Sequence, residues 1–395
     1  MTAQRSPWSL GLAGACATLI GIGLARFAYT PMIPALVQAH WFSASAANYL
    51  GAANLFGYLL GAVSAHGLSE RWGTRRVMGA SLLLTIVSFF ACAEPWGLGW
   101  YLAWRGLAGV TGAVLMVVAA PSALARVDAR HRPRVSALVF TGIGVGVIFA
   151  GTVVPWLAQR SVATAWIALG ALAAALALAS WPVWRSLAPL ESETQNSRRI
   201  SRAMPVLAVS LLVAVYTFDA IGFVPHTVFW VDFIARQLGR GLAAGGHDWT
   251  LFGVGAACGP LLAGALAART GFRGGLLAAV TVKAAAVALP LASVTASALA
   301  ASSLAVGALV PGVVALSSGC VAELVPAARQ KQVWGWMTTM FALAQTVAGY
   351  GMSWLYDQIG TYLPLFAIGA GSLLLGALCA LALVSLSPLA PMRVR

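Results

Sequence analysis

Three charged side chains interrupt segments that are otherwise apolar: Arg26, Arg105 and Asp219. A charge at the centre of a bilayer costs at least about 2.5–3.5 kcal/mol, so each should face a partner or water. Asp219 has three interpretations. In the first, it is a fixed counter-ion to Arg26 or Arg105. In the second, it carries a proton, and a bound substrate displaces its pairing with an arginine. In the third, it binds a cationic substrate directly.

The two arginines outnumber the carboxylate, which leaves a positive excess. Because guanidinium groups hold carboxylates bidentately, an anion clamped by Arg26 is favoured over a cation. Tyr29, Tyr216 and His226 are near these charges in the sequence and are candidates for contacting the same ligand, although tyrosines also mark membrane interfaces. His226 is expected near the outer surface, as a pH-sensitive group. For Lys283, inside another apolar segment, pairing with protein or lipid competes with snorkelling.

Apolar segments of roughly twenty residues dominate the chain, of which 60% is hydrophobic and only 9% charged. Soluble domains have about 25% charged residues. Segments of this length cross the hydrocarbon core of a membrane as helices. Twelve can be marked: Leu10–Leu36, Ala46–His66, Val77–Cys92, Leu98–Ala123, Val135–Trp156, Ala163–Val183, Met204–Trp230, Trp249–Ala268, Gly274–Val294, Ala298–Val321, Val333–Leu355 and Tyr362–Leu386. The sequence therefore predicts an all-α membrane protein with twelve transmembrane helices.

Basic residues are unevenly distributed over the loops between these segments. Alternate loops and the chain ends hold 18 of the 24, the other loops hold 3 (Arg160, Arg236 and Arg240), and 3 lie inside apolar segments. By the positive-inside rule the basic loops and both termini are cytoplasmic, as an even number of helices requires. The net charge of +14 is thus a topology signal, and no nucleic-acid partner is expected.

The two halves of the chain repeat a basic, glycine-containing elbow. Glu70–Arg76 (ERWGTRR) follows the second apolar segment, and Ala268–Arg273 (ARTGFR) follows the eighth, 198 positions later. Internal repeats of this kind are typical of solute transporters. A polar run at 191–199 separates the halves. The predicted domains are two six-helix bundles joined by a cytoplasmic linker, at residues 1–186 and 204–395 for the bundles and 187–203 for the linker.

Residues 66–76 resemble the loop motif of the major facilitator superfamily, glycine-x-x-x-acid-basic-x-glycine-x-basic-basic. Here His66 stands at the first glycine and Glu70 at the acid. The resemblance covers essentially the whole chain and implies the major facilitator fold, two bundles of six helices. In that superfamily the loop latches the cytoplasmic side of the outward-open state. The residues that match the latch are Glu70, Arg71, Gly73, Arg75 and Arg76.

Further segments support the resemblance. Arg105–Ala113 (RGLAGVTGA) is similar to the arginine-x-x-x-glycine motif of helix four, which is commonest in proton-coupled members. The fifth segment has glycines at 142–151 but its proline, Pro155, comes late, so it matches the antiporter signature only partly and favours export. Gly21–Pro31 (GIGLARFAYTP) is similar to the YbfB/YjiJ-type bacterial branch, whose substrates are mostly unassigned.

In the superfamily, helices one, four, seven and ten line a central cavity, which would bring Arg26, Arg105 and Asp219 together. The leading hypothesis is a secondary transporter that is proton-coupled and moves a small organic anion, such as a carboxylate, outward by alternating access. An efflux antiporter for cationic drugs is the alternative. More remote are a membrane-embedded enzyme, for which clustered histidines or paired carboxylates are missing, and a sensor built on a transporter fold.

The sequence also bounds the partners. No phosphate-binding loop, metal-ligand spacing or cysteine framework is recognisable, so no cofactor and no metal are expected. The expected partners are a small-molecule substrate, protons and the lipid bilayer, with the chain as a monomer. Abundant Arg, Ala and Gly beside only two lysines indicate a GC-rich bacterial genome and hence a bacterial inner membrane.

Overall fold

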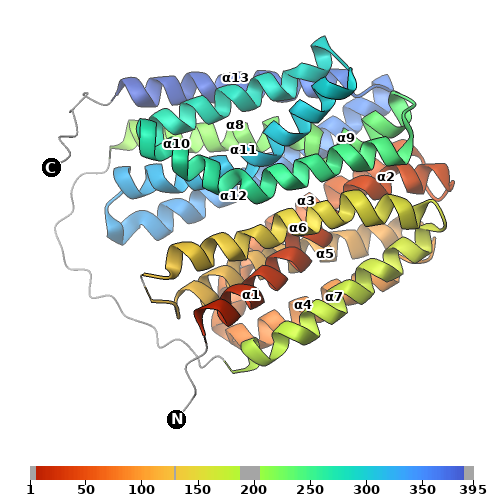
Figure 1. Ribbon diagram of the computed structural model, residues 1–395, viewed down its shortest axis with the longest axis horizontal. Helices are drawn as coiled ribbons and strands as arrows, with labels where there is room; N and C mark the ends of the chain where they lie inside the picture. Colours follow the sequence, from red (N-terminus) through yellow and green to blue (C-terminus); the bar gives the residue numbers. More distant parts are fainter. Residues whose placement is uncertain (1–5, 129, 187–204, 387–395) are drawn as a thin grey trace.

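The computed structural model describes residues 6–128, 130–186 and 205–386, and within these ranges every regular element is a helix (Figure 1). The predicted linker and the chain ends, with Arg5, Arg198, Arg199, Arg202, Arg393 and Arg395, lie outside the described residues. The elements are α1 (Pro7–Thr18), η1 (Leu19–Leu24), α2 (Tyr29–Gln38), α3 (Ala44–Trp72), α4 (Thr74–Ala91), α5 (Leu98–Leu124), α6 (Arg132–Ala158), α7 (Val162–Arg185), α8 (Val206–Gly222), η2 (Pro225–Phe229), α9 (Trp230–Asp232), η3 (Phe233–Gln237), α10 (Gly241–Ala292), α11 (Ala296–Leu324), α12 (Ala327–Ile359) and α13 (Leu363–Ser385).

These elements make twelve membrane spans. In the described part of the chain, nine helical stretches are long and apolar enough to cross a bilayer. One of them, α10, contains two spans joined at Gly271, and α3 and α12 add two more of 29 and 33 residues that carry more polar side chains. The run from α1 to α2 is the first span, and the run from α8 to η3 is the seventh. The structure thus confirms the predicted all-α fold.

The spans form two bundles that lie side by side, α1–α7 in the lower part of Figure 1 and α8–α13 in the upper part. We call the end with the α3–α4, α5–α6 and α11–α12 loops the basic end. The end with the α2–α3, α4–α5, α6–α7 and η3–α10 loops is called the opposite end. Packing inside each bundle follows its apolar faces, with α5 against α3 and α4 in the first half and α11 against α10 in the second.

The repeated elbow has the same backbone geometry in both halves. Gly73 ends α3 with a φ of 82°, and Gly271 interrupts α10 with a φ of 72°. Residues with a side chain avoid this left-handed region, whereas glycine enters it without steric cost. The two elbows, 198 positions apart, therefore form the same sharp helix-to-helix turn, which supports the duplication inferred from the sequence.

The first and seventh spans are irregular, just before Pro31 in the first span and from Pro225 onward in the seventh. In the first span, the backbone N–H of Ala25 reaches back five residues to the carbonyl of Ile20, and residues 25–28 form turns before α2 begins. In the seventh span, Pro225 opens η2. Proline lacks an N–H and displaces the preceding turn, so it breaks the regular ladder. The irregular segments place backbone carbonyls in the middle of the molecule, where side chains can reach them.

Small residues let the two halves approach closely between α6 and α10. A Cβ built on Gly144 would lie 2.7 Å from the Cβ of Ala257, and one on Gly246 would lie 2.7 Å from the Cγ of Pro155. Both are closer than real Cβ contacts allow, so only glycine fits. Because lipid tails are as apolar as the helices, close backbone approach of this kind is what favours helix contact in a membrane.

Candidate substrate site

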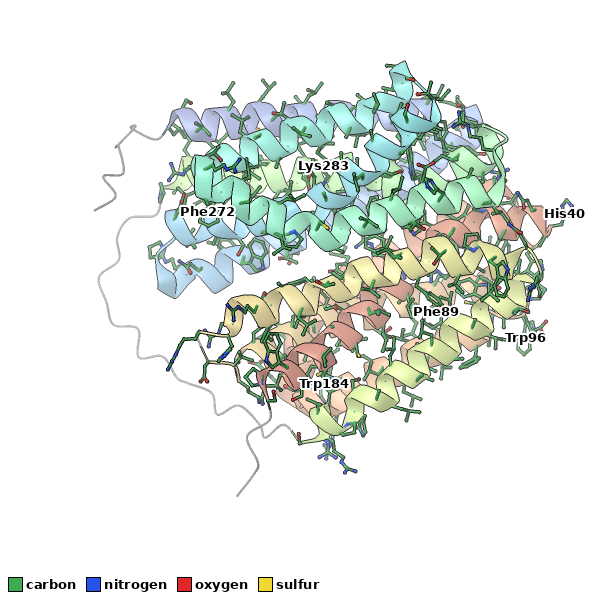
Figure 2. All side chains as sticks on the ribbon, viewed as in Figure 1. His40, Phe89, Trp96, Trp184, Phe272 and Lys283 are labelled. Carbon is green, nitrogen blue, oxygen red and sulfur yellow. The ribbon has the colours of Figure 1, made fainter. Side chains whose placement is uncertain are left out.

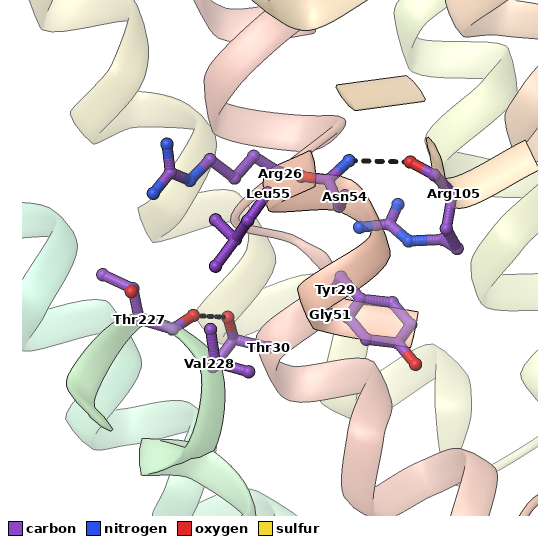
Figure 3. Close-up of a pocket in the computed structure, with 9 residues that line it drawn as sticks. All are labelled: Arg26, Tyr29, Thr30, Gly51, Asn54, Leu55, Arg105, Thr227 and Val228. Carbon is purple, nitrogen blue, oxygen red and sulfur yellow. Dashed lines mark hydrogen bonds between the residues drawn. The ribbon is translucent and has the colours of Figure 1, made fainter. Parts of the chain in front are cut away.

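A small cavity lies between the two halves, near the middle of the molecule (Figure 3). Its volume is about 10 Å³, which is about the room that one water molecule needs. An organic solute does not fit in this conformation, so the side chains around it are closed on one another. The lining residues come from α2, α3, α5, η2 and the turn before α2: Arg26, Tyr29, Thr30, Gly51, Asn54, Leu55, Arg105, Thr227 and Val228.

Arg105 is nearly completely buried at this cavity, with 2% of its surface exposed. Its Nη1 donates to the carbonyl of Ala25 at 2.9 Å, and its guanidinium lies 4.2 Å from the ring centroid of Tyr29. The Nε and Nη2 groups are buried without a hydrogen-bond partner. Asn54 supports the arrangement, because its Nδ2 donates to the carbonyl of Arg105 at 3.0 Å.

Arg26 reaches across to the second half. Its Nη2 donates to Oε1 of Gln345 on α12 at 3.0 Å, and its guanidinium lies 5.2 Å from the ring of Tyr58. The Nε2 of Gln345 is buried without a partner. In the view of Figure 3, Asn54 lies between Arg26 and Arg105. The sequence analysis missed Gln345. The available signal was a single amide side chain inside the eleventh apolar segment.

The charges of this site are all positive. Within the described ranges, neither Arg26 nor Arg105 forms an ion pair with a carboxylate. The buried polar atoms without partners around them, on Arg105 and Gln345, are all N–H donors. A buried donor without an acceptor is costly, so the site is complementary to a ligand that brings acceptor oxygens and negative charge.

Asp219 does not join the arginines, which corrects the expectation that all three charges share the cavity. Its Oδ1 accepts from Nζ of Lys283 at 2.7 Å, with the Asp219 and Lys283 side chains 1% and 0% exposed. Figure 2 shows Lys283 inside the second bundle. The counter-ion of Asp219 is therefore a lysine on α10 rather than Arg26 or Arg105. Lys283 pairs with protein and does not snorkel.

His226 and Tyr216 also pack inside the molecule. His226 is completely buried and stacks on Trp230 with ring centroids 4.2 Å apart, so the expectation that it lies near the outer surface was wrong. Its Nε2 lies 2.8 Å from Oγ of Ser302, whose hydroxyl donates to another carbonyl. Tyr216 packs on Phe341 of α12 with centroids 4.6 Å apart, and it does not line the cavity.

A second polar cluster closes the opposite end and was not found from the sequence. Asp232 is fully buried and accepts from Nε and Nη2 of Arg236 at 2.5 and 2.6 Å. The hydroxyl of Tyr362 also donates to Asp232, and Nδ2 of Asn48 in the first half donates to that hydroxyl at 3.2 Å. The side chain of Thr30 donates to the carbonyl of Thr227 across the same interface. The i,i+4 spacing of Asp232 and Arg236 was the available signal.

The predicted latch residues lie at the basic end and are exposed there: Glu70, Arg71, Gly73, Arg75 and Arg76. Glu70 pairs within its own helix with Nε2 of His66 at 3.0 Å. Within the described residues, no ion pair joins this loop to the second half. Polar contacts thus join the halves at the opposite end, whereas the predicted latch residues make no ion pair across the halves among the described residues.

Two bundles of six helices around a charged central cavity define a membrane transporter of the major facilitator type, rather than an enzyme. The family model described as "Uncharacterised MFS-type transporter YbfB" matches residues 18–381 of the chain. The chain belongs to this family, as the sequence resemblance indicated. No curated protein matches the chain.

Solved structures share the fold at low sequence identity. The chain is similar to a D-xylose-proton symporter, with a TM-score of 0.75 and 16% identity over 96% of this chain and 98% of that one. It is also similar to the xylose transporter XylE from E. coli in a partially occluded inward-open conformation, with a TM-score of 0.72 and 14% identity over 97% and 98% of the two chains. These similarities establish the fold over almost the whole chain.

Proposed function

We propose that the protein is a secondary active transporter that moves a small organic anion, a carboxylate, by alternating access. Arg26 and Arg105 bind the carboxylate. The observation that carries the proposal is the pair of guanidinium groups at the central cavity, neither of which has a carboxylate partner among the described residues. Two N–H groups of Arg105 are also buried there without a partner. Tyr29, under Arg105, orders the site rather than binding the anion.

The same observation argues against the cationic alternative. A multidrug exporter that takes cations needs a free carboxylate at the cavity, and the buried carboxylate of Asp219 is already neutralised by Lys283. We infer that Asp219 is a structural counter-ion rather than a substrate ligand. Its role as a proton carrier is the competing hypothesis, because Oδ2 of Asp219 has no partner.

We propose proton coupling and export as the transport mode. The arginine-x-x-x-glycine pattern at Arg105 and Gly109 supports coupling, and a proton symporter among the solved structures of similar fold agrees with it. The partial antiporter pattern on α6 supports export. Since no nucleotide-binding motif is recognisable in the sequence, the energy would come from an ion gradient.

The proposed location is a bacterial inner membrane, with the basic end and both termini in the cytoplasm and the chain acting as a monomer. On this topology the conformation described above faces the cytoplasm, because the halves are joined by Asn48, Tyr362 and Asp232 at the opposite end. Glu70 and the arginines of its loop would then latch the basic end when the protein faces outward. Their exposure in the present conformation agrees with that role.

A thermal-shift screen of the purified protein tests the anion site. A carboxylate at 100 times its Kd adds about 2.7 kcal/mol of stability. We expect stabilisation by small carboxylates, loss of that stabilisation in Arg26→Ala, and strong weakening in Arg26→Lys, because an ammonium group lacks the bidentate geometry. Arg160→Ala is the matched control, since Arg160 stacks on Trp156 at the opposite end, away from the cavity. Stabilisation by cations alone, retained in Arg26→Ala, would overturn the proposal.

A further inference from the structure

Asp248 is a buried carboxyl group to which the preceding sections give no role. It lies on the first span of α10, just before the apolar segment that the sequence indicated, and 6% of its surface is exposed. Its Oδ1 is enclosed without a hydrogen-bond partner, and no ion pair to it is found among the described residues. In the described part of the chain, the two carboxylates that are completely buried, Asp219 and Asp232, each have a basic partner.

The charged groups around Asp248 do not neutralise it. His247, the residue before Asp248, is exposed. Arg240 precedes the first turn of α10, and its guanidinium donates to the carbonyl of Val294. The end of the seventh span packs against this part of α10, but its Arg236 is bound to Asp232. The neighbouring stretches of α6 and α11, residues 144–155 and 296–307, contain no titratable side chain.

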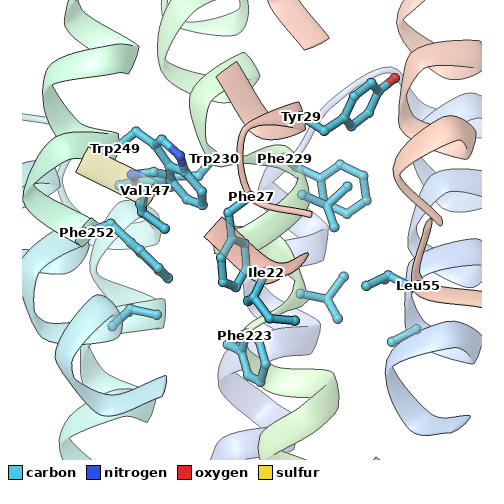
Figure 4. Close-up of a cluster of buried hydrophobic side chains, with 14 of the residues drawn as sticks. Ile22, Phe27, Tyr29, Leu55, Val147, Phe223, Phe229, Trp230, Trp249 and Phe252 are labelled. Carbon is cyan, nitrogen blue, oxygen red and sulfur yellow. The ribbon is translucent and has the colours of Figure 1, made fainter. Parts of the chain in front are cut away.

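The turn of α10 that holds Asp248 belongs to the contact between α6 of the first half and α10 of the second. Gly246, two residues earlier, packs on Gly151 and Pro155 of α6. Trp249, the next residue, stacks on Phe252 at 4.7 Å and lies edge-on to Phe27 at 6.0 Å (Figure 4). Phe27 is the neighbour of Arg26 in the chain. A change in the position of this turn is therefore transmitted both to the α6–α10 contact and to the proposed anion site.

We propose that Asp248 is a proton-binding group whose protonation state controls the movement of the two halves. This rests on the proposed transport function, of which it names the proton site. With the opposite end closed, the carboxyl group is enclosed without a counter-ion and holds its proton. When the α6–α10 contact opens toward the opposite end, water reaches Asp248, and the carboxyl group loses or regains its proton by exchange with the water on that side. Protonation thus favours the conformation closed at the opposite end, and ionisation favours the open one.

The first test is the infrared carbonyl band of protonated carboxyl groups, measured on the full chain in lipid in mildly acidic buffer. Asp248→Asn keeps the shape of the side chain and removes the titrating group. We expect the band in the unmodified protein, its loss in Asp248→Asn and its retention in Asp219→Asn, because Asp219 is paired with Lys283 and ionised. A band unchanged in Asp248→Asn overturns the assignment.

The second test measures how pH shifts the two conformations. Spin labels at Trp96→Cys and Ala243→Cys, in a chain whose five native cysteines are replaced by alanine, report the separation of the halves at the opposite end, where Figure 2 places Trp96. We expect acid to raise the short-distance population about tenfold in the otherwise unmodified chain, and Asp248→Asn to show the short distance at every pH. A pH response that survives Asp248→Asn, and is lost in Asp219→Asn, assigns the proton to Asp219 and overturns the proposal.

Neither test uses a substrate. A failed carboxylate screen would therefore remove the proposed anion function and leave the proton site to be judged by its own two measurements. Conversely, a carboxylate that binds through Arg26 while Asp248→Asn changes neither readout would retain the proposed function and remove the proton site.

Discussion

The two halves of the molecule hold their buried cations in opposite ways. In the second half, Lys283 lies 2.7 Å from Asp219, and Arg236 lies 2.5 Å from Asp232. In the first half, Arg105 is equally buried, but its contacts are a carbonyl and an aromatic ring, and two of its N–H-bearing nitrogens have no partner. The second half pairs these two cations with carboxylates of its own, whereas the first leaves positive charge at the cavity between the halves.

The difference separates structural charges from charges available to a ligand. Removing one member of a buried ion pair leaves an uncompensated charge and costs about 3–5 kcal/mol. A buried cation without a carboxylate partner already bears that cost. Its contacts with a carbonyl and an aromatic ring are weaker than an ion pair. Its pairing energy is therefore still available when an anion arrives. Substitutions at the two kinds of site should accordingly affect different properties.

The largest effect is expected for Asp219→Ala, which leaves Lys283 charged and unpaired in the second half. We expect a loss of about 3–5 kcal/mol of stability, measured as the thermal midpoint of the protein in lipid or detergent. The double variant Asp219→Leu with Lys283→Met should recover most of the loss, because two apolar side chains of similar volume replace the pair. Equal midpoints for Asp219→Ala and the unmodified protein would show that Lys283 has another partner, and the contrast between the halves would fail.

Arg105→Met tests the other side of the comparison. The variant loses the bond to Ala25 and the stacking on Tyr29, but it also removes an uncompensated charge, so stability should change by about 1 kcal/mol or less. Transport of the carboxylate found in the thermal-shift screen should fall about 100-fold, since charge-assisted hydrogen bonds contribute about 1.5–3 kcal/mol each. The measurement pairs a thermal midpoint with uptake into vesicles. A strongly destabilised Arg105→Met with normal transport would make Arg105 a structural residue.

Much of the fold could be predicted because it depends on local properties of the chain. The lengths of the apolar segments define the spans, and the glycines at 73 and 271 define the repeated turns through their positive φ. The long α10 was also separable into two spans at Gly271 from the elbow motif. The irregular turns of the first span could not be placed in this way, since they lie at residues 25–28, before Pro31.

The site was only partly predictable, because pairing depends on which faces of different helices meet. Arg26, Arg105 and Tyr29 do line one cavity. The partner of Asp219 could not be assigned, since Lys283 lies 64 positions further along the chain. Several charged residues were expected at a similar depth in the membrane. Asp248 fell just outside the predicted segment Trp249–Ala268, because hydropathy averages over a helix end and α10 begins at Gly241. The side chains of Asn48 and Tyr362 meet across 314 positions, which no local pattern records.

Tyr362→Phe gives the smallest of the expected effects and tests whether the opposite end is held by its polar cluster. The variant keeps the ring that stacks on Tyr356 with centroids 4.2 Å apart, but it removes the hydroxyl that joins Asn48 of the first half to Asp232 of the second. Asp232 stays paired with Arg236, so the second half remains folded. The lost bonds weaken the contact between the halves by about 1–2 kcal/mol. That corresponds to roughly a tenfold rise in the population open at this end, read from the Trp96→Cys and Ala243→Cys labels. Tyr356→Phe is the matched control, because its hydroxyl accepts from Nη2 of Arg236 within the second half, at 3.4 Å. If both variants open equally, the bridge to Asn48 does not hold the halves together, and apolar packing and the α6–α10 contact alone close this end.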